Sequence, residues 1–145
     1  MDRVHRRLAT VLAADAVGYS RLTGRDEEGT LATLRAHRQI IDRLIVQYAG
    51  RVFGSAGDSV IAEFASPVEA VRCATEIQLE IDRQNAELPE PSRLRFRIGI
   101  NLGDIVVEGD NLMGDGVNVA ARLEALSHPG GICIDRKSTR LNSSH

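Results

Sequence analysis

The sequence is poor in several features, and each shortage excludes a class of protein. No apolar run approaches the ~18 residues that a membrane-spanning helix needs, although 43% of the 145 residues are hydrophobic. This composition predicts a soluble globular domain without a membrane segment. The N-terminal arginines Arg3, Arg6 and Arg7 are not followed by an apolar segment, so we expect no signal peptide. The net charge is −2 and the arginines are spread along the chain, which argues against a nucleic-acid partner.

Cysteine and histidine are also scarce. The two cysteines, Cys73 and Cys133, lack the spacing of metal ligands. Their apolar surroundings predict small core residues with free thiols, which fits a reducing, cytoplasmic location. His5, His37 and His128 are scattered and predict no zinc site; we expect them at the surface.

The chain contains a single lysine, Lys137, which lies in an unusual polar tail. The string Asp135–His145 resembles a translated sequencing adapter, because an adapter reading frame encodes it residue for residue. The alternative is a polar natural tail. We therefore expect residues 135–145 to be non-native and residues 1–134 to be one domain cut off before its natural end.

Hydrophobic periodicity predicts an α+β domain with the element order βαββαββαβ. We expect a ferredoxin-like βαββαβ core, with an antiparallel-rich sheet and the helices on one face. Ser66-Pro67-Val68-Glu69 is a capping box that opens a helix ending before Pro89. The other expected helices are Asp26–Ala49 and Val117–Ser127, and the expected strands are Leu8–Ala14, Arg51–Ser55, Ser59–Phe64, Arg95–Asn101, Asp104–Glu108 and Ile132–Ile134. The second and third strands should form one hairpin, and the fourth and fifth another.

Two aspartates follow strands that this topology brings together. Asp15 ends the first apolar run, and Asp58 follows Gly57 in the first hairpin turn. A β-α-β crossover makes the first two strands parallel, with the third inserted between them, so both carboxylates should lie at one edge of the sheet. Hard divalent cations prefer carboxylate oxygens. Asp15 and Asp58 are therefore predicted to bind Mg²⁺ or Mn²⁺, two ions together with a triphosphate.

Four sequence blocks in this order resemble the catalytic domain of class III nucleotidyl cyclases, the adenylate and guanylate cyclases. They are Leu12–Ser20, Gly57–Phe64, Arg97–Gly103 and Val117–Glu124, and the resemblance around them covers residues 6–134. The resemblance implies that the ribose 3′-hydroxyl of a purine nucleoside triphosphate attacks the α-phosphate and expels pyrophosphate. It also implies a cyclase fold that is incomplete here, because the closing strands of the family follow Ile134.

The same resemblance gives roles to further residues. Asn118 and Arg122 are four residues apart, hence on one helical face; Asn118 would hold the ribose and Arg122 would stabilise charge on the phosphate in the transition state. The turn after Asp15 would cradle a phosphate through its main-chain N–H groups. That turn comprises Ala16, Val17, Gly18, Tyr19 and Ser20.

Base choice does not follow from the sequence. The positions that contact the base in this family are occupied by Gly54, which has no side chain, and Asn111, which can face either purine. ATP is expected on the family's prevalence of adenylate cyclases alone. The resemblance further implies a homodimer with two composite sites, acting in intracellular signalling. The alternative is a non-catalytic nucleotide-binding or regulatory cyclase-like domain, and Gly54 favours that alternative.

Overall fold

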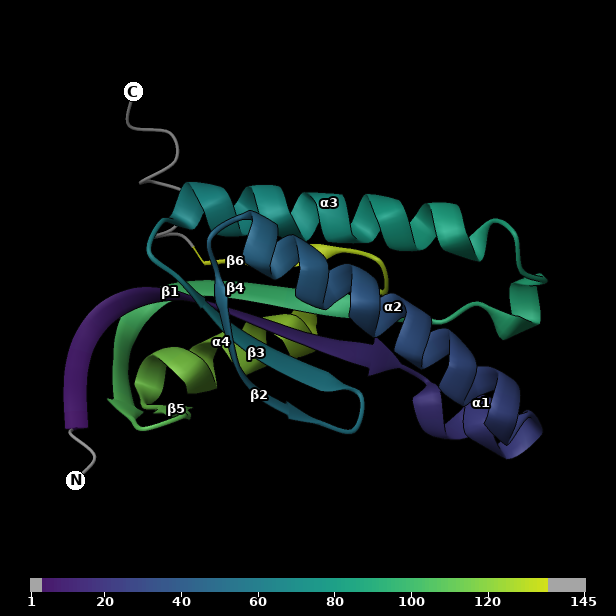
Figure 1. Ribbon diagram of the computed structural model, residues 1–145, viewed down its shortest axis with the longest axis horizontal. Helices are drawn as coiled ribbons and strands as arrows, with labels where there is room; N and C mark the ends of the chain where they lie inside the picture. The colour runs from purple at the N-terminus through teal and green to yellow at the C-terminus, as the bar shows by residue number, and fades with distance from the viewer. Residues whose placement is uncertain (1–3, 136–145) are drawn as a thin grey trace.

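A six-stranded sheet forms the centre of the molecule (Figure 1). The computed structural model describes residues 4–135, except for the side chains of Ser55 and Ala56; the expected tail beyond Asp135 lies outside this range. The strand order is β2-β3-β1-β4-β5, and β6 pairs with β4 in parallel. The strands are β1 (Val4–Val17), β2 (Arg51–Ala56), β3 (Ser59–Phe64), β4 (Arg95–Glu108), β5 (Asn111–Met113) and β6 (Ile132–Ile134).

The central strands confirm the predicted ferredoxin-like βαββαβ core. β3 pairs antiparallel with both β1 and β2, so β1 and β2 run parallel with β3 between them. β4 lies on the other side of β1 and pairs with it antiparallel along its whole length, from Val4 opposite Glu108 to Val17 opposite Arg95. This arrangement places the ends of β1 and of the β2–β3 hairpin at the same edge of the sheet.

Two long helices, α2 (Glu27–Gln47) and α3 (Pro67–Asn85), cover one face of the sheet. Asp26 caps α2 by accepting a hydrogen bond from the Gly29 N–H at 3.0 Å, and Ser66 caps α3 by accepting from Glu69. Their buried residues pack on the even-numbered side chains of β1, such as Leu12 and Ala14. The short helix α1 (Tyr19–Arg25) and the 3-10 turn η1 (Glu90–Ser92) complete this layer.

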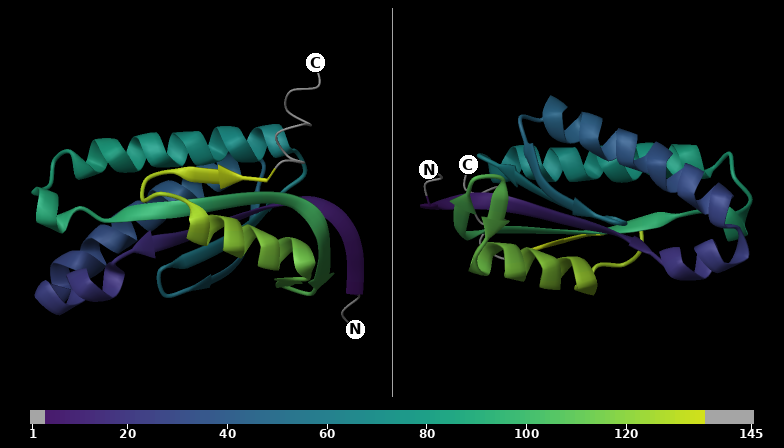
Figure 2. Two further views of the ribbon diagram at one scale, coloured as in Figure 1. Left: turned by 180° about the vertical axis from the view of Figure 1, so that it is seen from behind. Right: turned by 60° about the horizontal axis from the view of Figure 1, so that its bottom comes forward.

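The expectation that all helices share one face is wrong for α4 (Asp115–Leu126). Figure 2 shows α4 on the side of the sheet opposite α2 and α3. There Ala120 packs with the odd-numbered residues of β1, Ala9, Val11 and Ala13, in a second core cluster. The physical reason is that β1 and β4 are apolar on both faces, and a sheet with two apolar faces must be covered on both.

The predicted hairpin between Arg95–Asn101 and Asp104–Glu108 is also wrong. Both segments belong to one continuous strand, β4, and the chain reverses later, at Gly109, which has a φ of 60°. Gly103 serves the packing of α4 instead of a turn, because a Cβ there would lie 3.2 Å from the Gly116 Cα. Residues 109–114, where the sequence predicts no strand, contain the short strand β5, which pairs with the end of β4.

Of the three histidines expected at the surface, His37 is completely buried. Its Nδ1 lies 2.8 Å from the Thr33 carbonyl oxygen, one helical turn earlier, and its ring stacks on Phe96 with 6.1 Å between centroids. The prediction failed because His37 lies on the buried side of α2, which faces the sheet and Phe96 of β4. Cys73 is buried as expected, and both cysteines are free thiols.

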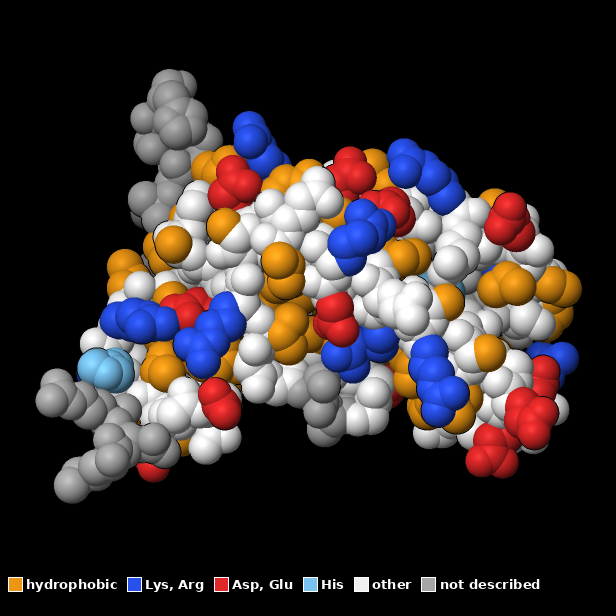
Figure 3. All heavy atoms as spheres, viewed as in Figure 1, with side chains coloured by type: hydrophobic (Ala, Val, Ile, Leu, Met, Phe, Trp, Pro, Cys, Tyr) orange, Lys and Arg blue, Asp and Glu red, His pale blue; other side chains and the backbone are white. Residues whose placement is uncertain are grey.

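The face formed by α2 and α3 carries basic and acidic side chains next to one another (Figure 3). One such pair joins the two helices, since the Arg43 guanidinium lies 2.6 Å from a Glu80 carboxylate oxygen. Among residues 4–135, no helix combines the length and apolarity required to cross a bilayer.

Candidate functional site

The carboxylates of Asp15 and Asp58 meet at one edge of the sheet. Asp15 lies near the end of β1, opposite Ser59 on β3 and Arg97 on β4. Asp58 lies in the β2–β3 turn, where Gly57 adopts a left-handed φ of 59°. The Ala16 N–H donates to the Asp58 carbonyl oxygen at 3.2 Å, which fastens this turn beside Asp15. The predicted convergence of the two aspartates is present in the structure.

The proximity of the two acids changes the protonation of Asp15. Burial, the charge of Asp58 and a hydrogen bond between the two side chains together raise the pKa of Asp15 to about 6. Hydrogen bonds from the Ala16 N–H and from Glu124 act in the opposite direction. Like-charged carboxylates in a half-buried setting are stabilised by a cation, so the donor set fits Mg²⁺ or Mn²⁺.

Within the part of the chain that the structure describes, no three His, Cys, Asp or Glu side chains form a complete metal cage. Two aspartates alone would leave most of the coordination shell to other donors. Mg²⁺ is commonly bound in this way, by one or two carboxylates with water and substrate phosphates. The arrangement therefore suits an ion that arrives with a phosphorylated substrate.

Glu124 is a further member of this cluster, and the sequence alone predicts no role for it. It projects from α4, and burial together with the charge of Asp15 raises the pKa of its carboxyl to about 7. Arg97 opposes that rise. The spacing of four residues between Ala120 and Glu124 indicates that both lie on the same side of the helix. The sequence does not indicate which face of the sheet this side covers, so it does not bring Glu124 to Asp15.

Asn118 and Arg122 are not brought to Asp15 and Asp58 of the same chain. Both side chains are exposed on α4, on the side away from the sheet, and neither makes a side-chain hydrogen bond or ion pair within residues 4–135. They share one helical face, as their spacing predicted. One chain thus displays two separate groups of candidate site residues.

The segment Ala16–Ser20 joins the end of β1 to the start of α1. Gly18 caps α1 with a left-handed φ of 69°, and its carbonyl oxygen accepts from the Leu22 N–H at 3.0 Å. The Ala16 N–H is already occupied by Asp58. The N–H groups that the turn can offer to a phosphate are therefore those at the beginning of α1 rather than that of Ala16.

The two positions considered for base contact lie on neighbouring elements. Gly54 is in β2, just after a shift of register at Phe53, and a Cβ built on it meets no atom within 4 Å. Asn111 begins β5 and is exposed. An ion pair of 3.6 Å between Arg51 and Asp110 links β2 to the turn that precedes Asn111.

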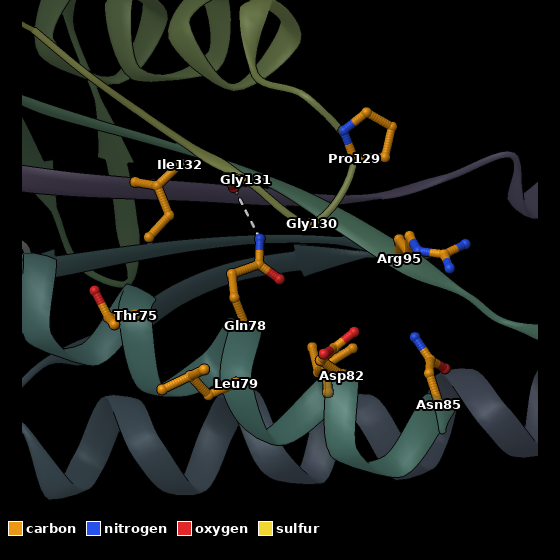
Figure 4. A pocket seen from close by; sticks show the side chains of 11 residues that line it. Thr75, Gln78, Leu79, Asp82, Asn85, Arg95, Pro129, Gly130, Gly131 and Ile132 are labelled. Atoms are coloured by element: carbon orange, nitrogen blue, oxygen red, sulfur yellow. Dashed lines mark hydrogen bonds between the residues drawn. The ribbon is translucent and has the colours of Figure 1, made fainter. Parts of the chain in front are cut away.

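A cavity of about 430 Å³ lies away from all of these residues, between α3 and the turn before β6 (Figure 4). Gln78 holds that turn by donating to the carbonyl oxygens of Phe96 at 3.0 Å and Gly131 at 2.8 Å. Asp15 and Asp58 do not line this cavity. The candidate site is instead an open edge of the sheet on the side of α4.

Comparisons with known proteins bear on the family and the fold. Residues 4–144 match the family described as adenylate and guanylate cyclase catalytic domain. The crystal structure of adenylate/guanylate cyclase/hydrolase from Silicibacter pomeroyi superposes with a TM-score of 0.91 at 42% identity, covering 98% of this chain and 83% of that one. That of the adenylyl cyclase CyaB from P. aeruginosa gives a TM-score of 0.85 at 24% identity, covering 98% and 83%, and supports the fold alone.

Among curated proteins, "Putative adenylate cyclase 3" of Rhizobium meliloti (strain 1021) is 51% identical over 134 residues. The match covers 92% of this chain but only 23% of the relative's length. The α+β fold, the matched blocks and these similarities lead to one conclusion. The chain belongs to the family of adenylate and guanylate cyclase catalytic domains.

Proposed function

We propose that this chain is the catalytic domain of an adenylate cyclase-type lyase, which converts ATP into a 3′,5′-cyclic nucleotide and pyrophosphate. The observation that carries the proposal is the meeting of Asp15 and Asp58 at the sheet edge, where burial and mutual repulsion favour a bound cation. The relative that is 51% identical bears an adenylate cyclase name, which supports the same assignment.

Asp15 and Asp58 would hold two Mg²⁺ or Mn²⁺ ions together with the triphosphate. When bound, these ions would lower the pKa of the attacking 3′-hydroxyl and neutralise charge on the leaving oxygens. The first N–H groups of α1, next to Gly18, would bind a phosphate oxygen. The left-handed conformation of Gly18 turns the chain so that these groups face the end of β1.

Asn118 and Arg122 would act on the substrate held by a second copy of the chain. Both are exposed on α4 of their own chain, and we infer that they complete a site across an interface. Leu126, at the end of the same helix, is 74% exposed and offers apolar area for such an interface. In a two-fold dimer, two equivalent sites would form. Arg122 would stabilise the charge that develops on the α-phosphate, and Asn118 would orient the ribose.

Purine discrimination is expected to be weak. Gly54 offers no side chain to the base, and the space around it is open. A site rejects the wrong base strongly only when its own polar groups would be left unpaired. We place the reaction in the cytoplasm, as part of cyclic nucleotide signalling, in keeping with the free thiols of Cys73 and Cys133.

The proposal is tested by assaying the purified chain for cyclic AMP with Mn²⁺ and ATP. Asp58→Asn should lower the rate by about a hundredfold or more, because a metal ligand is lost while the turn is kept. The matched control is Asp104→Asn, an exposed carboxylate on β4, which should retain wild-type activity. A folded wild-type chain that binds Mn²⁺-ATP without turnover would instead support the non-catalytic alternative.

A further inference from the structure

Helix α4 is seated on β4 with unusually close backbone contact. A Cβ on Gly99 would lie 2.2 Å from the Glu124 nitrogen and 2.3 Å from the Ala120 carbonyl oxygen, so only glycine allows this approach. At the other end of the helix, the buried Asn101 side chain donates to the Gly116 carbonyl oxygen at 3.1 Å. The position of Glu124 relative to the sheet is therefore fixed at both ends of α4.

This seat places Glu124 above the carboxylate cluster. Gly99 is opposite Ala13 in the β1–β4 ladder, and Arg97 is opposite Asp15, two residues along on the same face of the sheet. The Glu124 side chain shares a hydrogen bond with Asp15 and lies within the field of Arg97 and Asp58. The Nε of Arg97 is buried and has no hydrogen-bond partner among the described residues.

We propose that Glu124, held between the Gly99 seat and Arg97, is a positioning residue that fixes the Asp15 side chain in the orientation required for metal binding. The inference rests on the proposed function, since it assumes that Asp15 is a metal ligand. A ligating carboxylate is free to rotate unless its second oxygen is held, and partners of this kind typically change metal affinity or activity 10–100-fold. In addition to the Ala16 N–H and Asp58, Glu124 supplies such a partner for Asp15, and it does so from a rigid element.

The proposal also connects the two faces of α4. The side that holds Asp15 of its own chain through Glu124 is opposite the side that exposes Asn118 and Arg122. The close contact of α4 with Gly99 therefore fixes the positions of Glu124 on one side of the helix and of Asn118 and Arg122 on the other.

The test measures Mn²⁺ affinity by electron paramagnetic resonance, in the presence of an ATP analogue that cannot cyclise. Glu124→Ala should weaken Mn²⁺ binding about tenfold or more, while Glu124→Gln, which can still hydrogen-bond to Asp15, should recover most of that loss. The matched control is Glu108→Gln, an exposed acid on β4, which should bind Mn²⁺ as the wild type does. Thermal unfolding of each variant verifies that it is folded.

Arg97→Gln separates positioning from simple electrostatics. Removing a positive charge beside two carboxylates should tighten Mn²⁺ binding if charge alone matters. Loss of positioning should weaken it instead, by about tenfold. Wild-type Mn²⁺ affinity in folded Glu124→Ala, equal losses in Glu124→Ala and Glu124→Gln, or tighter binding in Arg97→Gln would each overturn the proposal. Because the readout is binding, a wild type that binds Mn²⁺ without making cyclic nucleotide would contradict only the proposed function.

Discussion

Lowering the pH from 7.5 to 5.0 should destabilise the fold through His37. This imidazole is completely buried, its Nδ1 is used by the Thr33 carbonyl, and its Nε2 has no hydrogen-bond partner among the described residues. Burial lowers the pKa of His37 from 6.5 to about 4. A proton added to the folded state would therefore sit on a buried ring whose Nε2 has no hydrogen-bond partner among the described residues.

The size of the effect follows from proton linkage. Between pH 4 and 6.5 the unfolded chain binds a proton at His37 and the folded chain does not, so stability falls as the pH falls through this window. One pKa unit corresponds to about 1.4 kcal/mol. At pH 5.0, which is 1.5 units below the ordinary histidine value, His37 should cost about 2 kcal/mol relative to pH 7.5.

Other groups act in the opposite direction. The pKa of Asp15 is raised to about 6 and that of Glu124 to about 7, so at these positions the folded chain binds more protons than the unfolded chain. Their contribution to stability increases as the pH falls from 7 toward 4. The pH dependence of the wild-type unfolding free energy therefore combines a destabilising contribution from His37 and stabilising contributions from Asp15 and Glu124 as the pH falls. The contribution of His37 is isolated by comparison with a variant that has no titratable group at this position.

The assay is urea unfolding followed by circular dichroism, at pH 7.5 and 5.0 in the presence of a chelator. His37→Leu keeps the volume but not the titration. The unfolding free energy of the wild type should fall by about 2 kcal/mol more than that of His37→Leu over this pH range. His128→Leu, at an exposed histidine, should behave like the wild type. Equal pH dependence in the wild type and His37→Leu would refute the reasoning.

Three further predictions concern packing and specificity. Gly99→Ala should destabilise the fold by about 3 kcal/mol in urea unfolding, because the new Cβ would collide with the α4 backbone. Gly54→Ala places its Cβ in open space and should leave the unfolding free energy unchanged. Equal effects of the two substitutions would contradict the close packing of α4 on Gly99. In steady-state kinetics, kcat/KM for ATP and GTP should differ by less than roughly a hundredfold, or about 2.7 kcal/mol; a larger ratio would mean that another residue reads the base. Gly54→Lys should fold normally and change that ratio, since the space beside Gly54 accommodates a side chain; an unchanged ratio would remove Gly54 from the base site.

The sequence predicted the pairing of the first three strands and the meeting of Asp15 with Asp58 because both depend on topology alone. A crossover followed by a hairpin has few solutions, and all of them bring the two strand ends together. The position of α4 depends instead on which face of the sheet remains uncovered. A clue was present in the first strand, where Val11 and Ala13 are as apolar as Leu12 and Ala14, a pattern typical of a strand covered on both faces.

The role of Glu124 and the continuity of β4 could not be predicted for a related reason. The sequence predicts Gly103 in a hairpin turn, whereas Gly99 and Gly103 both make room for the backbone of α4. A glycine in a strand signals either a bend or a close approach, and only the tertiary structure distinguishes them. The contact between Glu124 and Asp15 follows from that approach, and no local pattern contains it.

The central claim is that the two groups of site residues on one chain serve different substrates, and mixed dimers test it most directly. Asp15→Asn and Arg122→Ala should each inactivate both sites of their homodimers. The two homodimers, assayed separately, are the controls. Co-expressed, the two variants should form dimers in which one site carries both lesions and the other carries neither. With random pairing, half the dimers are mixed, so cyclic nucleotide formation should return to roughly a quarter of the wild-type rate. Verified mixed dimers without any recovery would contradict the shared site.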